Sequence, residues 1–171
     1  MSTLNGLALP DGSGPRAYTE AELCCLVRLV TAACGPSGNV VVGSGRTPAG
    51  RDRAAAITAV WSATGGQVTD VVSWPEEAAS WLRHARRFTA STPDVWIVAG
   101  PLPGWAGMCR RLYDSTDWNP ARTFGFADLA DVRLGVAAGW KRVAGMRGAL
   151  ADGGTWTASF SGLITRGPSS R

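Results

Sequence analysis

The residues of this chain that most resemble a binding site form a glycine-rich turn, Gly43-Ser44-Gly45-Arg46-Thr47, directly after a short apolar run. Glycines let a ligand approach the backbone, the first amides of a following helix point at an anion, and arginine adds positive charge. The turn lacks the Gly-Lys-Ser/Thr end of a Walker loop, and Pro48 stands where a Gly-x-Gly-x-x-Gly fingerprint has its last glycine. Two interpretations remain: an anion or nucleotide site, and a tight strand-to-helix turn.

Residues for catalysis or metal binding are sparse. His84, the only histidine, falls on an expected helix among arginines, far from the edge at which the strands end. No Ser-His-Asp or Cys-His arrangement can be assigned, and there is no Gly-x-Ser-x-Gly elbow. Asp128 and Asp131 follow an expected strand and fit either a helix start or groups that bind a ligand amine or metal, and Asp70 is equally ambiguous. We predict no catalytic residue, no metal site and no cofactor.

The four cysteines show neither the spacing of zinc ligands nor a Cys-x-x-Cys redox pair. Two of them are adjacent, so on a helix they point to different faces. We expect all four to be reduced residues that pack in the core or between helices of a cytoplasmic protein: Cys24, Cys25, Cys34 and Cys109.

Eight tryptophans are many for 171 residues. Trp74 and Trp105 are expected in loops at the carboxyl ends of strands, where they would either pack the loops or line an apolar cleft. Trp118, Trp140 and Trp156 lie near the last expected strands. Because tryptophan is enriched in interfaces, these three are candidates for contact with another lobe or chain.

The elements that must position these residues alternate between strand and helix. Thr19 and Glu22 form a capping box at the start of the first helix. Strands are expected at 39–42, 67–73, 95–99 and 122–127, with two short strands around 140–148 and 155–164, and helices at 20–33, 48–63, 75–88, 105–113 and 129–139. This order predicts an α/β fold: a three-layer Rossmann-like parallel sheet with flanking helices and a C-terminal pair of short strands.

The loops after parallel strands share one edge of the sheet, where ligands bind in such folds. The expected ligand-binding residues are therefore Gly43, Ser44, Gly45, Arg46, Thr47, Trp74, Gly100, Trp105 and Asp128. The length favours a single domain, residues 19–166, made of an N-terminal helix (19–34), a Rossmann-like core (39–139) and the strand pair (140–166). Residues 1–18 are expected to be loose, and 167–171 to be a tail.

Composition indicates a globular protein, with 45% hydrophobic and 18% charged residues and a net charge of +4. The basic clusters at 83–87 and 110–111 fall on expected helices, where a solvated face explains them, so we do not expect a nucleic-acid partner. The apolar stretch 24–33 is too short for a membrane span and contains Arg28. Residues 1–10 lack the features of a signal peptide.

From Asn39 to Gly148 the chain resembles one lobe of the type 1 periplasmic-binding-protein fold, of the branched-chain amino-acid-binding kind. The residues that carry the resemblance are Ala63-Thr64-Gly65-Gly66-Gln67-Val68, the segment Thr92 to Gly100 in which Asp94 precedes a strand, the helix Trp105 to Leu112, and Gly145-Met146. A complete binding protein has two lobes and an export signal, and this sequence shows neither. The resemblance therefore implies a cytoplasmic offshoot of the fold that pairs with itself or with another chain.

These observations favour a non-catalytic binding or assembly module that acts through a partner chain, self-association or a small ligand at the strand carboxyl edge. The alternative is a small enzyme or a nucleotide- or phosphate-binding protein that uses the Gly43–Gly50 loop, with Arg46 as the anion anchor. A third possibility is an assembly protein that exchanges its N-terminal segment and C-terminal strands between subunits.

Overall fold

The structure is a computed structural model that describes residues 3–4, 7–8 and 17–170. The strands are β1 (Thr3–Leu4), β2 (Leu7–Ala8), β3 (Asn39–Gly45), β4 (Gln67–Trp74), β5 (Val95–Val98), β6 (Thr123–Gly125), β7 (Arg147–Ala149), β8 (Thr155–Ser159) and β9 (Gly162–Arg166). The α-helices are α1 (Glu20–Cys34), α2 (Pro48–Ala63), α3 (Leu82–Thr89), α4 (Leu102–Ser115), α5 (Arg133–Ala138) and α6 (Trp140–Val143). Two 3-10 turns, η1 (Pro120–Arg122) and η2 (Ala127–Leu129), flank β6. Most of the segment 1–18, expected to be loose, lies outside the described residues.

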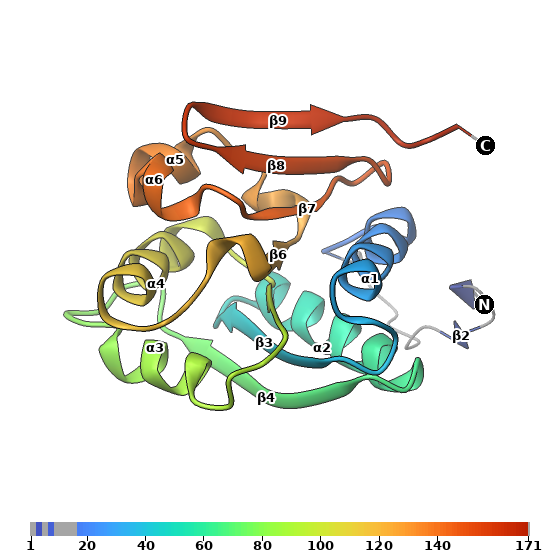
Figure 1. Ribbon diagram of the computed structural model, residues 1–171, viewed down its shortest axis with the longest axis horizontal. Helices are drawn as coiled ribbons and strands as arrows, with labels where there is room; N and C mark the ends of the chain where they lie inside the picture. The colour runs from blue at the N-terminus through green and yellow to red at the C-terminus, as the bar shows by residue number, and fades with distance from the viewer. Residues whose placement is uncertain (1–2, 5–6, 9–16, 171) are drawn as a thin grey trace.

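The main sheet has seven strands in the order β4-β3-β5-β6-β7-β8-β9. The strands from β4 to β7 run parallel, and β8 and β9 continue the sheet antiparallel. Figure 1 shows this succession from β4 at the bottom to β9 at the top. The predicted α/β class, with its parallel sheet, flanking helices and final strand pair, is confirmed.

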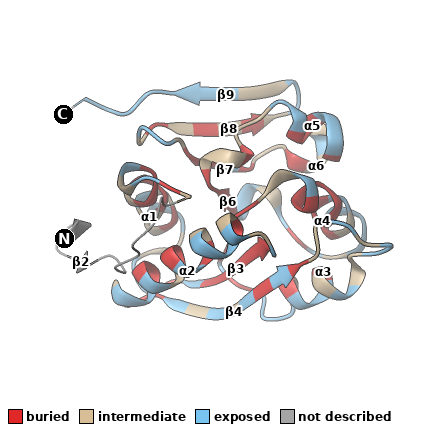
Figure 2. Cartoon of the chain, turned by 180° about the vertical axis from the view of Figure 1, so that it is seen from behind, coloured by how far each residue is buried: buried red, intermediate tan, exposed pale blue. Residues whose placement is uncertain are grey.

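Helices cover both faces of the parallel strands. Val40 and Val42 of β3 pack in the core formed with α1 and α2, whereas Val41 packs in the core formed with α3 and α4. This arrangement explains why the strand appears in the sequence as a continuous apolar run. Figure 2 shows the buried residues concentrated in the inner strands, while β9 at the edge is mostly exposed. No described helix has the length and apolar character needed to cross a membrane.

Two helices begin as the sequence predicts. At α1, the Thr19 hydroxyl accepts a hydrogen bond from the Glu22 amide (3.1 Å), and the Glu22 carboxylate accepts one from the Thr19 amide (3.3 Å), which completes the capping box. At α2, Pro48 is the first residue and the Thr47 hydroxyl accepts a hydrogen bond from the Gly50 amide (3.1 Å). Both starts orient helices whose first turns lie at the carboxyl edge of the sheet.

The helix expected from Pro75 begins only at Leu82, so its predicted start is wrong. Residues 75–81 form an irregular segment instead. The Trp81 indole N–H donates to the Pro75 carbonyl (3.0 Å), and the Glu76 carboxylate accepts a hydrogen bond from the amide of Arg46 (2.9 Å). One contact within the segment and one to the end of β3 thus replace helical hydrogen bonds. The next helix, α4, begins earlier than its predicted start at Trp105.

The C-terminal part also differs from the prediction. The strand expected around 140–148 is the short helix α6 followed by β7, because Gly139 and Gly145, with φ of 90° and 100°, turn the chain on either side of α6. The helix expected at 129–139 is divided into η2 and α5. The last expected strand is a hairpin of β8 and β9 that turns at Phe160 and Ser161.

Candidate functional site

A pocket of about 370 Å³ opens at the carboxyl edge of the sheet, beside the first turn of α1. Its walls come from α1, α2 and the segments that follow β6 and β7. This carboxyl-edge pocket is lined by Ala17, Tyr18, Thr19, Glu22, Arg53, Ala127, Asp128 and Ala151. It occupies the edge that the sequence predicted for ligands, although Asp128 is the only lining residue among those predicted to bind one.

Arg53 and Asp128 form an ion pair in this pocket. Arg53 Nη1 lies 3.1 Å from Asp128 Oδ2 and 3.3 Å from the Ala99 carbonyl, while Nε donates to the Ala17 carbonyl (3.0 Å). The two side chains are 13% and 19% exposed. No hydrogen bond joins Arg53 Nη2 to any described residue, so this group remains available as a donor.

Glu22 joins α1 to the far side of the pocket. Its Oε1 accepts a hydrogen bond from the amide of Ala127 (2.6 Å), while Oε2 accepts the capping bond from Thr19. The side chain is buried. Sequence reasoning identified Glu22 only as a helix cap, because nothing in its local pattern indicates a bond to a residue so distant in the chain.

The surroundings of the pocket alter the acidity of both carboxyl groups. Burial raises the pKa of Asp128 to about 6, against the opposing charge of Arg53 and with the added repulsion of Glu22. Burial also raises the pKa of Glu22, although the amides of Ala127 and Thr19 oppose the shift. Asp128 Oδ1 is buried and has no hydrogen-bond partner among the described residues. Arg53 Nη2 is therefore the donor without a described partner at this pocket, whereas Asp128 Oδ1 is enclosed, and the amides of Asp128 and Leu129 oppose the rise in the pKa of its carboxyl group.

The glycine-rich turn includes the end of β3, and two of its amides already have partners. Residues 43–45 are buried, and the Gly45 amide donates to the Gly100 carbonyl (2.8 Å). The next amide, that of Arg46, donates to the Glu76 carboxylate (2.9 Å). The predicted turn from strand to helix is present, and the position expected for a bound anion holds a carboxylate of the chain itself.

Gly100 lies between Glu76 and Asp128. Its φ is +69°, and a Cβ added to it would stand 1.9 Å from Asp128 Oδ2. Its carbonyl also accepts the hydrogen bond from Gly45. Gly100 was predicted as a ligand-binding residue, and the structure shows that its small size lets Asp128 approach the backbone.

Trp74 and Trp105 do not lie in loops, so their predicted placement is wrong. Trp74 is the last residue of β4, Trp105 is within α4, and neither is exposed. Their ring centroids are 5.8 Å apart, and both rings contact Phe88. A buried aromatic cluster beneath the edge explains the two tryptophans, since no part of either faces an open cleft.

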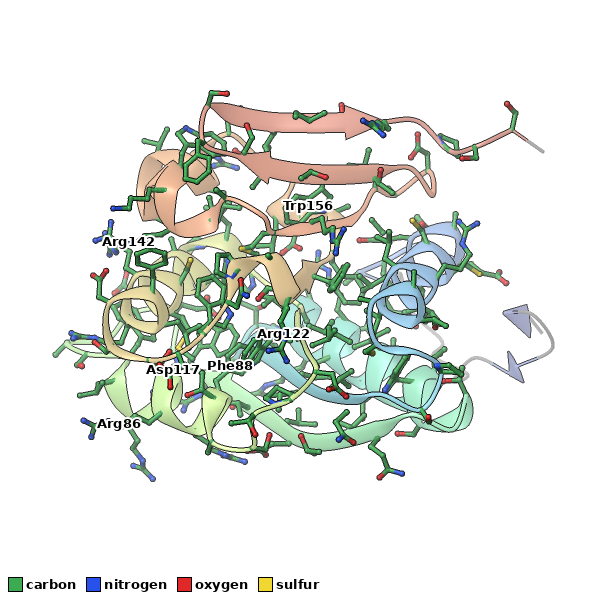
Figure 3. The ribbon with its side chains drawn as sticks, viewed as in Figure 1. Arg86, Phe88, Asp117, Arg122, Arg142 and Trp156 are labelled. Atoms are coloured by element: carbon green, nitrogen blue, oxygen red, sulfur yellow. The ribbon has the colours of Figure 1, made fainter. Side chains whose placement is uncertain are left out.

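Trp118 and Trp156 are also buried in the core of this chain. Trp118 makes an edge contact with Trp105, with ring centroids 5.7 Å apart. Figure 3 shows Trp156 beneath the C-terminal strands, directed toward the body of the protein. The chain itself covers these two side chains, so their expected contact with another lobe or chain is not supported. Trp140 is half-buried, and its role in an interface stays a prediction.

The single histidine and the four cysteines lie in surroundings that change their acidity. Burial is the largest effect lowering the pKa of His84, followed by the charges of Arg46, Arg83 and Arg87. Because Arg46 follows β3 directly, His84 lies nearer to the carboxyl edge than predicted. Burial raises the pKa of each cysteine thiol, and no described His, Cys, Asp and Glu residues gather in a group that could hold a metal.

A second pocket, of about 350 Å³, lies at the amino edge of the sheet. Arg122 borders it, with its guanidinium 5.2 Å from the Trp96 ring centroid and its Nε 2.7 Å from the Asp94 carbonyl. This amino-edge pocket is lined by Arg86, Thr89, Thr92, Pro93, Trp96, Ser115, Thr116, Asp117 and Arg122, three of which Figure 3 labels. Sequence reasoning did not predict it, because its residues lie at helix ends and before strands.

The sequence matches no known protein family and no characterised protein. Solved structures do match the fold. Two carry names that assign them to branched-chain amino acid ABC transporters: one from Rhodospirillum rubrum (TM-score 0.61, 19% identity, 77% of this chain and 37% of that chain) and one from Burkholderia xenovorans (0.57, 15%, 74% and 33%). A third, named as a sugar ABC transporter from Actinomyces odontolyticus, has a TM-score of 0.53 at 17% identity over 80% of this chain and 45% of that chain.

The chain thus spans less than half the length of each of these structures. At such low identity the likeness establishes the fold alone. It confirms the resemblance inferred from residues 39–148: this chain has the fold of one lobe of a type 1 periplasmic binding protein.

Proposed function

We propose that this chain is a ligand-binding lobe that takes a small polar solute in the carboxyl-edge pocket. The observation that carries the proposal is the Arg53–Asp128 ion pair, which lines an open pocket at the edge where such folds bind ligands. Arg53 Nη2 serves as a donor to the ligand, and the partly exposed Asp128 carboxylate serves as an acceptor.

The chemistry of the pocket selects a ligand with its own donor and acceptor groups. An amino acid provides an ammonium and a carboxylate, and a sugar provides hydroxyl groups that act in both ways. The names of the matching structures include both classes, as transporters of branched-chain amino acids and of sugar. We propose binding without turnover at this pocket.

A partner chain or a second copy would complete the site. The pocket is open to solvent on one side, and in this proposal a facing surface closes over the bound solute. If a second copy closes the site, adding the ligand should increase the native mass of the protein. Size exclusion with light scattering measures this mass. An unchanged monomer mass in the presence of a ligand that binds would contradict the partner.

A thermal-shift panel of amino acids, sugars, inorganic phosphate and nucleotides tests the proposed ligand. One of the first two classes should raise the melting temperature, and Asp128→Asn should remove most of that gain. Asp131→Asn is the matched control, because Asp131 lies on the same loop and bonds to the exposed Arg133. Stabilisation by nucleotide alone, or a gain that survives Asp128→Asn, would count against this function.

A further inference from the structure

The Glu76 carboxylate is positioned as a bound anion would be. It follows β4 within the irregular segment 75–81, and its Oε1 accepts a hydrogen bond from the Arg46 amide (2.9 Å). That amide belongs to the turn whose glycines and arginine predicted an anion site. The structure therefore contains the predicted interaction, with a side chain of the same chain as the anion.

Glycines from two different elements leave room for this carboxylate. A Cβ added to Gly45, at the end of β3, would lie 2.0 Å from Glu76 Oε1. A Cβ added to Gly104, in the first turn of α4, would lie 2.6 Å from Oε2. Any larger residue at either position would displace the carboxylate, so the surrounding backbone is shaped around two anionic oxygens.

The groups around Glu76 favour negative charge. The first turn of the 14-residue helix α4 faces it, and Pro101 gives that helix no side-chain cap. Glu76 Oε2 is buried and has no hydrogen-bond partner among the described residues. Arg46 is exposed and forms no ion pair with a described residue, and its charge acts on the nearby His84. A bound oxyanion would accept from the same Arg46 amide and could pair with the guanidinium of Arg46, with which Glu76 forms no ion pair.

We propose that the end of β3 and the first turn of α4 form an oxyanion-binding site with Glu76 as its built-in occupant, for which a phosphate or carboxylate ligand competes. Displacement of Glu76 would loosen residues 75–80, because the Trp81 indole bond to Pro75 lies within the segment and the Ser80 hydroxyl accepts only from the adjacent Leu82 amide. Trp81 itself stays packed against Gly107 of α4. The inference is independent of the proposed function, since Gly100 separates this site from the carboxyl-edge pocket.

Chemical rescue of a Glu76→Ala variant tests the site. Thermal unfolding of wild type, Glu76→Ala and the control Glu77→Ala is measured in chloride, acetate and inorganic phosphate at equal ionic strength. Glu77 is the exposed neighbour, and no hydrogen bond links its side chain to a described residue. Glu76→Ala should melt below wild type, and one of the two oxyanions should restore most of that loss. Equal responses of the two variants would overturn the proposal.

A second substitution locates the bound anion. Gly104→Ala in the Glu76→Ala background should reduce the rescue, because its Cβ occupies the position of Oε2. Rescue that Gly104→Ala leaves intact would overturn this location. If Glu76→Ala does not fold, Glu76→Gln against Glu77→Gln replaces the pair, and a larger phosphate response of the former supports the site while equal responses overturn it.

Competition in the wild type is read by hydrogen exchange of residues 75–81. Amide exchange there should increase when the rescuing anion is added to the wild type, whereas chloride should leave it unchanged. If amide exchange of residues 75–81 stays unchanged at an anion concentration that saturates the Glu76→Ala variant, the anion does not displace Glu76. The acetate and phosphate arms distinguish a carboxylate ligand from a phosphate ligand.

Discussion

The two halves of the carboxyl edge hold a similar group in opposite ways. On one half, Asp128 is paired with the guanidinium of Arg53 at an open pocket, and its other carboxylate oxygen is buried. On the other half, Glu76 is held by a backbone amide and packed against two glycines. Asp128 is thus paired with a charged side chain beside an open pocket, whereas Glu76 is held by a neutral amide and fills the space between two glycines.

Gly100 and Pro101 lie between the Asp128 half and the Glu76 half of the carboxyl edge. Gly100 approaches Asp128 on one side, and Pro101 lies against Gly45 beside Glu76 on the other. The same loop is held to β3 by the hydrogen bond from Gly45 to Gly100. Changes at these residues therefore show whether the two carboxylates act independently.

The largest expected effect comes from Arg53→Met, which leaves Asp128 buried without its counter-ion. Removing one member of a buried pair typically costs about 3 kcal/mol of unfolding free energy, and we expect a loss of this order at pH 8. Urea unfolding followed by circular dichroism measures it. Arg51→Met on the exposed side of the same helix is the control. If the two variants lose the same free energy of unfolding, the ion pair with Asp128 does not contribute to the stability of this half of the edge.

Asp128→Asn sharpens the comparison through pH. Because the folded pKa of Asp128, about 6, lies above its value in the unfolded chain, its contribution to stability is complete below about pH 4 and is lost as the pH rises through 6. The stability of wild type relative to Asp128→Asn should therefore fall by up to about 3 kcal/mol between pH 4 and pH 7. Urea unfolding across this range measures the difference. If the difference in unfolding free energy does not change with pH, the pKa of Asp128 is not raised in the folded protein.

Gly100→Ala tests the boundary between the halves. The substitution combines a left-handed φ with a Cβ that meets Asp128, so we expect it to cost about 2 kcal/mol or more. Gly65→Ala is the matched control, since Gly65 has φ +94° and nothing within 4 Å of its added Cβ. Thermal unfolding compares the two variants. Equal losses would mean that backbone strain, and not the approach of Asp128, sets the requirement for glycine.

The smallest effect is expected at the amino edge, where Arg122→Met removes a cation over Trp96 and hydrogen bonds to the Asp94 and Pro93 carbonyls. A loss of about 1 kcal/mol is expected, because the guanidinium is largely solvated. Arg86→Met, in the same pocket, has no hydrogen bond to a described residue to lose and serves as the control. A loss as large as that of Arg53→Met would remove the contrast between the two edges.

The position of the carboxyl edge could be predicted from the sequence better than the contacts of the residues that lie there. The apolar run of β3, the cap at Thr19 and the proline at the start of α2 are local signals, and each specified its element correctly. Asp128 was found because it follows a strand. Arg53 was not, because its position inside a helix carries no local sign that its side chain reaches across to the loop after β6.

Glu76 shows how a reasonable local interpretation fails. Proline followed by two acids is typical of a helix start, yet Pro75 and Glu76 precede the helix by a whole segment. The carboxylate instead bonds to a backbone amide of a neighbouring strand end. Tertiary contacts with Gly45 and Gly104 decide this position, and their effect is invisible in a single sequence. The buried tryptophans were misplaced for the same reason, since residues at the ends of expected elements can still point inward.

The carboxyl-edge pocket draws residues from almost the whole length of the chain. Ala17 and Ala151 both line it, and the Thr19 hydroxyl donates to the Ala151 carbonyl. During synthesis on the ribosome, α1 and its capping box can form early, but the wall after β7 emerges much later. The walls of the pocket are therefore complete only after Ala151 has been translated and β7 has joined the sheet.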